Sequence, residues 1–120
     1  MLKKTLIASL ALLSIVHTSA FAKSPADLND LEIAHVAYTA DSIDIRTAHL
    51  ALAKSDDPAV QAFARTMIRD HEAVNERALD LVARLNASPQ DNFLSQALSA
   101  RSDLLVEELS QLNGTAFDRR

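Results

Sequence analysis

The chain has 120 residues, more acidic than basic side chains, a single glycine and no cysteine. The lack of cysteine excludes disulfides and thiolate chemistry, and an acidic surface without a basic cluster argues against nucleic acid or anionic lipid as a partner. One glycine and few aromatic residues favour helices, and they argue against sheets and glycine-rich phosphate loops.

Residues 1–22 are predicted to be a secretory signal peptide. Two lysines precede an apolar run from Leu6 to Val16, and the small residues Ala20 and Ala22 predict cleavage before Lys23. The run is shorter than the roughly 20 residues of a membrane-spanning helix, so no transmembrane segment is expected after cleavage. Cleavage would leave one domain, residues 23–120, with 10 basic and 16 acidic residues and a net charge of −6, in the periplasm or cell envelope of a bacterium.

Three long helices joined by very short turns are predicted, near residues 30–54, 58–86 and 90–113. Each proline follows a residue that can cap a helix, and proline loses no hydrogen bond at the first helical position. These pairs are Ser24-Pro25, Asp57-Pro58 and Ser88-Pro89. An alternative start for the first helix has Asn29 as the cap and Glu32 completing a capping box. Very short turns predict antiparallel neighbours.

The second helix carries the longest apolar stripe of the chain. Its apolar residues recur at the i, i+3, i+4, i+7 spacing of a packed helix, and His71 falls inside this stripe. The first helix is apolar on two faces, which predicts two neighbours. Asp44 lies at the centre of its small-residue face, among Ala37, Ala40 and Ala51.

The third helix is predicted to close at Asn113-Gly114, with the sole glycine in the left-handed conformation at its end. Thr115 could then cap a further helix, because the acidic residue Asp118 follows it at the three-residue spacing of a capping box. Either a fourth helix begins here or the end is a frayed polar tail. The expected fold is an all-α, ferritin-like, up-and-down helical bundle with three long helices present and a fourth only begun.

Several strings, taken together, resemble the bacterial domain-of-unknown-function family 4142. They are IAHVAYTADSIDI, LALAKSDDPAVQAFARTMIRDHEAVNERALDLVARL, SPQDN and GTAFDR, nearly end to end after residue 22. The resemblance implies an exported, ferritin-like protein with no established activity. The family pattern continues with a helix that usually carries a Glu and a His. Because Arg120 precedes any such helix, the resemblance implies an incomplete ferritin-like domain.

Asp44 and His71 are predicted to meet. They lie about 12 and 14 residues from the turn between the first two helices, so at about 1.5 Å per residue their heights differ by roughly 3 Å. A buried carboxylate needs a partner, and one interpretation is a structural pair, in which Asp44 accepts a hydrogen bond from His71 and fixes the helix register. The alternative is part of a metal site facing the bundle interior, for an ion such as Fe, Mn or Zn.

Other charged residues are assigned surface roles. Glu32 and His35 form the one Glu-x-x-His motif, which does not suffice for a di-iron site. Asp70 is expected to pair with Arg46, and His49 is expected to be solvated.

Two functions remain open from the sequence. The first is a non-enzymatic, exported protein that acts by binding at the envelope or in stress, and that self-associates through open apolar faces. The second is a metal-handling protein whose site includes Asp44 and His71.

Overall fold

The computed structural model describes residues 23–120; the predicted signal peptide lies outside this part of the chain. All regular structure within it is helical, as the sequence predicts. A short 3₁₀ turn, η1 (Pro25–Asp27), leads into α1 (Asp30–Lys54). The Asn29 side chain accepts hydrogen bonds from the backbone N–H groups of Leu31 and Glu32, so the alternative start of the first helix is confirmed.

The α1–α2 turn is as short as predicted. Residues 55–57 connect α1 to α2 (Pro58–Arg84), and the Asp57 carboxylate accepts from the N–H groups of Ala59 and Val60. The Gln61 side chain donates to the backbone oxygen of Ser55, 2.9 Å away, which ties the first turn of α2 to the end of α1. A tight turn forces α1 and α2 into an antiparallel hairpin.

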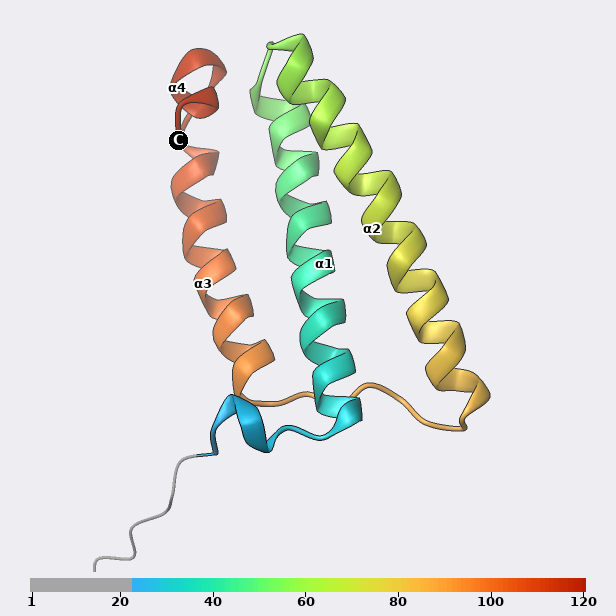
Figure 1. The fold of residues 1–120 in the computed structure, drawn as a ribbon. Coiled ribbons are helices and arrows are strands. Elements are labelled where there is room, and N and C mark those ends of the chain that lie inside the picture. The colour runs from blue at the N-terminus through green and yellow to red at the C-terminus, as the bar shows by residue number, and fades with distance from the viewer. Residues whose placement is uncertain (1–22) are drawn as a thin grey trace, which may run out of the picture.

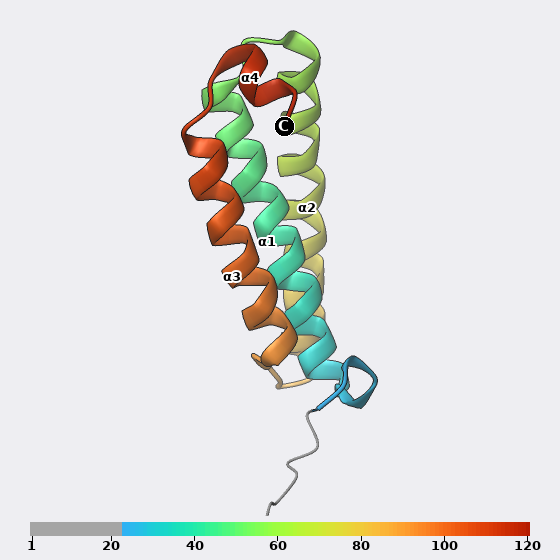
Figure 2. The same cartoon turned by 90° about the vertical axis from the view of Figure 1, so that its left-hand side faces the viewer.

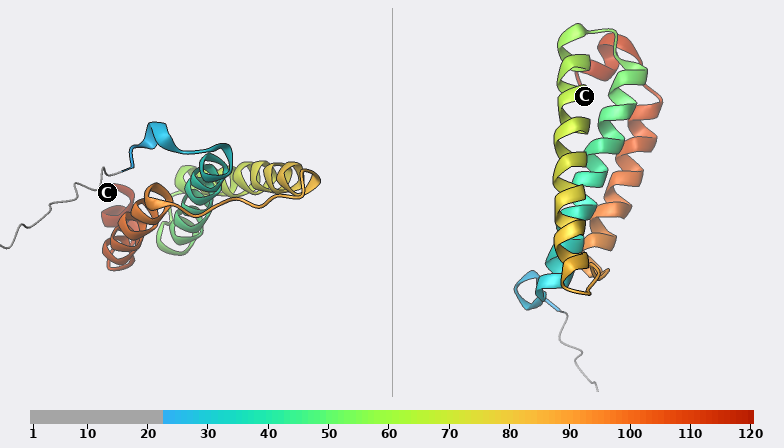
Figure 3. Two further views of the ribbon diagram at one scale, coloured as in Figure 1. Left: turned by 90° about the horizontal axis from the view of Figure 1, so that it is seen from below. Right: turned by 90° about the vertical axis from the view of Figure 1, so that its right-hand side faces the viewer.

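The start of α3 (Phe93–Ser110) lies later than predicted, because Ser88-Pro89 belongs to a loop and Asn92 is the cap. The Asn92 Oδ1 atom accepts from the N–H groups of Leu94 and Ser95, and its Nδ2 donates to the backbone oxygen of Glu32 in α1. That last bond joins the cap to a different helix, which local sequence does not reveal. The connection from α2 therefore spans eight residues, 85–92, and runs beneath the N-terminal end of α1 (Figure 3).

A single short helix, α4 (Gly114–Asp118), follows α3. Gly114 has a φ of +52°, the left-handed conformation predicted for it, but it begins α4 instead of closing α3, which ends at Ser110 with Gln111 as its cap. The Phe117 side chain is buried, and α4 contacts α1 near the upper ends of the helices (Figures 1 and 2). Of the two predicted alternatives, the turn of helix is the one observed.

The three long helices form one layer with α1 in the middle (Figure 1). α1 packs against both α2 and α3, which make no comparable contact with each other. α3 is parallel to α1, since Asn92 bonds to Glu32 at one end and the Lys54 ammonium donates to the backbone oxygen of Ser110 at the other. The chain direction thus alternates from α1 to α2 to α3, as in the predicted up-and-down arrangement, but α2 and α3 are not packed neighbours. The connection of residues 85–92 passes beneath α1 and places α3 on its other side.

The apolar core of this layer is small. Within residues 23–120 the buried apolar residues are Ala48, Ala64, Leu109 and Phe117. Many large apolar side chains are exposed instead, among them Phe63 at 66%, Leu81 at 61% and Leu85 at 69%. None of the described helices combines the length and apolarity needed to cross a bilayer. The predicted open apolar surface is therefore present in the structure.

Candidate functional site

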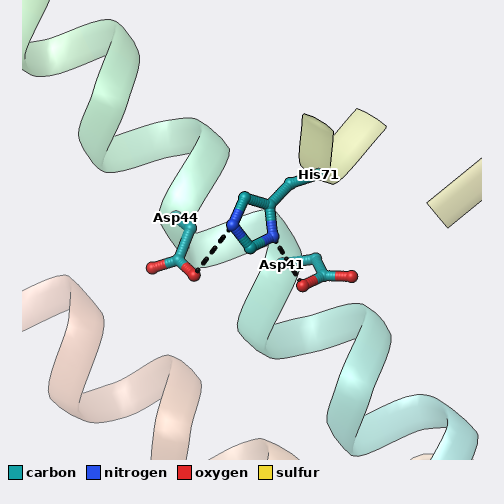
Figure 4. A group of neighbouring side chains, drawn as sticks. All are labelled: Asp41, Asp44 and His71. Carbon is teal, nitrogen blue, oxygen red and sulfur yellow. Dashed lines mark hydrogen bonds and ion pairs between the residues drawn. The ribbon is translucent and has the colours of Figure 1, made fainter. Parts of the chain in front are cut away.

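The site lies where α1 and α2 pack through small residues. Ala48 of α1 and Ala64 of α2 are both buried, and their short side chains let the two helices approach closely. Asp41 and Asp44 are three residues apart on α1, so they share one helix surface. The antiparallel hairpin places His71 of α2 opposite this surface (Figure 4).

His71 lies between two carboxylates (Figure 4). Its Nδ1 atom is 2.7 Å from Oδ1 of Asp41, and its Nε2 atom is 3.7 Å from Oδ2 of Asp44. The side chains of His71 and Asp41 are 24% and 19% exposed, whereas that of Asp44 is 46% exposed. One carboxylate is thus held within the α1–α2 contact while the other reaches solvent.

The sequence correctly brings Asp44 and His71 together, but it assigns the hydrogen bond to the wrong carboxylate. A separation of 3.7 Å is too long for a hydrogen bond, so Asp41 is the hydrogen-bond partner of His71. The sequence reasoning missed Asp41 because it lies at the edge of the small-residue face of α1. The signal for it was its i, i+3 spacing to Asp44, which places both carboxylates within reach of one imidazole.

An open groove adjoins the cluster between α1 and α2. Its volume is about 170 Å³, and Asp44 forms part of its wall. The remaining lining is small or apolar: Thr47, Ala48, Ala51, Val60, Phe63, Ala64 and Met67. Met67 is thus part of an apolar surface that is open. Asp44 meets solvent here because no other described helix covers the groove.

A second polar side chain lies beside the cluster. Asn75 follows His71 by one helical turn, so it is on the same face of α2. It is buried, and its Oδ1 atom has no hydrogen-bond partner among residues 23–120. The surface that α2 presents to α1 is therefore polar at two successive turns.

The Glu32 and His35 motif does not join this cluster. The Glu32 carboxylate binds the Lys23 ammonium at 2.6 Å, and His35 Nδ1 lies 3.7 Å from the Asp91 carboxylate at the start of α3. The Ser95 hydroxyl donates a hydrogen bond to the Asp91 carboxylate, and this bond is the main reason that the pKa of Asp91 is lowered. A hydrogen bond from the Gln96 amide lowers this pKa further. Both motif residues thus serve contacts near the N-terminal ends of α1 and α3.

The predicted ion pair between Asp70 and Arg46 is wrong. Asp70 pairs with its neighbour Arg69, and Arg46 pairs with Asp103 of α3. Arg46 lies on the surface of α1 that faces α3, not α2, so matching height along the helices was not sufficient. His49 is exposed, as expected.

Among residues 23–120, Asp41, Asp44 and His71 form the one cluster of three carboxylate or imidazole ligands whose candidate ligand atoms lie within 4.8 Å of one another. Imidazole and carboxylate are ligands for borderline divalent metals. The same groups can also join two helices by hydrogen bonding alone.

Residues 16–120 match the sequence profile of a family described as domain of unknown function (DUF4142). The chain belongs to this family. No curated protein and no solved structure matches the sequence significantly. The resemblance seen in the sequence strings is thereby confirmed at the level of the family.

Proposed function

We propose that this DUF4142 chain is an exported, ferritin-like binding protein of the periplasm or cell envelope, which works by association and not by catalysis. The observation that carries the proposal is the exposed apolar stripe of α2. Phe63, Val74, Leu81 and Leu85 are 46–69% exposed. Their spacings of 11, 18 and 22 residues from Phe63 bring them onto one side of the helix, within about 40° at 3.6 residues per turn.

This stripe continues into the groove beside Asp44, where Phe63 and Met67 meet the small residues of α1. Exposed apolar side chains repeated along one side of a helix mark a binding surface. In a ferritin-like bundle such a surface is covered by another helix. A second copy of the chain is the partner we propose, because two identical apolar faces can cover each other about a twofold axis.

Sedimentation velocity of the purified protein tests the association. We expect a dimer at micromolar concentration, and we expect Phe63→Ser combined with Leu81→Ser to give a helical monomer because the stripe is interrupted at two turns. Leu104→Ser is the matched control. Leu104 is an equally exposed leucine, at 69%, but it lies on α3 and not on the apolar stripe of α2. A wild-type monomer, or a double variant that remains a dimer, would contradict the proposal.

A second candidate function is metal handling, and the Asp41–His71–Asp44 cluster is the observation that favours it. This function needs no covered apolar face, since the Asp44 side chain already reaches solvent. It can therefore be tested independently of the oligomeric state.

A further inference from the structure

The two ring nitrogens of His71 have different surroundings. The 2.7 Å contact of Nδ1 with the Asp41 carboxylate is a hydrogen bond. An ionised carboxylate only accepts, so the ring nitrogen donates and the hydrogen is on Nδ1. In a neutral ring, Nε2 then carries the lone pair. This lone pair faces the Asp44 carboxylate.

The gap between Nε2 and the Asp44 oxygen has the width of a metal site. At 3.7 Å it exceeds a hydrogen bond. It is too short for a bridging water, since two hydrogen bonds of about 2.8 Å meeting at a tetrahedral angle span roughly 4.6 Å. A zinc-class ion about 2.1 Å from each ligand atom separates them by roughly 3.4 Å in tetrahedral geometry, and by slightly more when that angle opens.

The local charge also favours a cation. Asp41 and Asp44 occupy one turn of α1, and among residues 23–120 no lysine or arginine forms an ion pair with either of them. Of the side chains that form ion pairs in this part of the chain, His71 contacts both carboxylates. Like charges three residues apart on a helix repel. A divalent ion at Asp44 would offset this repulsion.

We propose that Nε2 of His71 and the carboxylate of Asp44 bind a divalent transition ion of the zinc class, with Asp41 as the positioning residue. This inference rests on the second candidate function. A metal-binding histidine commonly donates its other N–H to a carboxylate, which fixes the ring orientation and raises its basicity. Asp41 has this role toward His71. Water fills the remaining coordination positions on the solvent side of Asp44.

This pair of ligands selects among metals. Imidazole nitrogen favours Zn²⁺, Co²⁺ and Ni²⁺ over Mg²⁺ and Ca²⁺, which prefer sites made of oxygen atoms alone. Since only two protein groups bind the ion, it should exchange readily with solution. The site is therefore suited to transient metal binding and not to holding a permanent structural ion.

Calorimetric titration of the chelator-treated full chain with Zn²⁺ tests the site. We expect one ion per chain, no competition from millimolar Mg²⁺, and a loss of affinity of at least about tenfold for both His71→Ala and Asp44→Asn. Asp44→Asn keeps the size of a half-exposed side chain, so it remains informative if His71→Ala fails to fold. His49→Ala, at an exposed histidine outside the cluster, is the matched control and should bind as the wild type does.

The zinc affinity of two Asp41 variants tests the positioning role of this residue. Asp41→Ala should weaken Zn²⁺ binding by roughly 10- to 100-fold, and Asp41→Asn should recover part of the loss because its amide oxygen still accepts from Nδ1. Absence of Zn²⁺ binding, or binding that survives both His71→Ala and Asp44→Asn, would overturn the inference. Zinc binding by a monomer would support the metal site and refute the proposed association. A dimer that binds no zinc would support the association and refute the metal site.

Discussion

The two sides of α1 are held by different means. Toward α3, the contact has buried serine, threonine and leucine along its length, with polar links at both ends and in the middle. The buried residues are Thr39, Ser95, Ser102 and Leu109. The polar links are Asn92 to Glu32, Arg46 to Asp103, and Lys54 to Ser110. Distributed contacts of this kind keep α3 alongside α1 over its full length.

Toward α2, the polar links are concentrated at two places, the turn at Ser55 and the cluster around His71. Past His71, α2 leans away from α1 (Figure 1). The large apolar residues of that segment, Leu79, Leu81 and Leu85, are exposed. Within residues 23–120, His71 is therefore the last strong polar link between α1 and α2. The stability of the lower part of α2, residues 72–84, should depend on it.

The largest effect on stability is expected at the contact between α1 and α3, for Asn92→Ala. The substitution removes the cap of α3 and the bond to Glu32, and the side chain is buried. We expect a loss of about 2 kcal/mol in the free energy of unfolding, measured by urea denaturation. Asn113→Ala is the control, since the Asn113 side chain makes no cap bond to α4 and accepts only a long hydrogen bond of 3.4 Å from Lys54. Equal effects of the two substitutions would show that neither the cap bonds of Asn92 nor its bond to Glu32 stabilises the fold.

A smaller effect is expected at the cluster, for His71→Leu in metal-free protein. The variant keeps the apolar bulk but leaves Asp41 without its hydrogen bond, at a cost of about 1 kcal/mol for a partly exposed group. Hydrogen exchange should accelerate in residues 72–84 of α2 and stay unchanged in α3. Uniform acceleration in both helices would contradict the view that this cluster holds only the lower part of α2.

The smallest effect is expected at the surface pair, for Arg46→Ala. Both Arg46 and Asp103 are more than half exposed, at 52% and 66%. Such pairs contribute less than about 1 kcal/mol and are screened by salt. The difference in unfolding free energy between variant and wild type should shrink as NaCl rises from about 0.05 to 1 M. A difference independent of salt would point to packing of the arginine stem instead.

Local sequence predicted much of the helical framework. The alternative start at Asn29 and the cap at Asp57 are both as expected, and the rise per residue placed Asp44 and His71 at matching height. The start of α3 escaped prediction because Ser88 and Asn92 are both good caps. Asn92 has an additional partner in α1, and that partner is 60 residues away in the sequence.

The sequence alone was enough to predict that residues 23–120 form helices, that α1 ends near residue 54, and that an aspartate and a histidine face each other across the first hairpin. These features follow from capping, apolar periodicity and fixed rise, which act within a few residues. Packing in three dimensions was needed to establish that α3 lies beside α1 and not beside α2, that Arg46 faces α3, and that Asp41 is hydrogen-bonded to His71 while Asp44 reaches solvent. Those features depend on which side of α1 each neighbour occupies, and that is set by packing between distant segments.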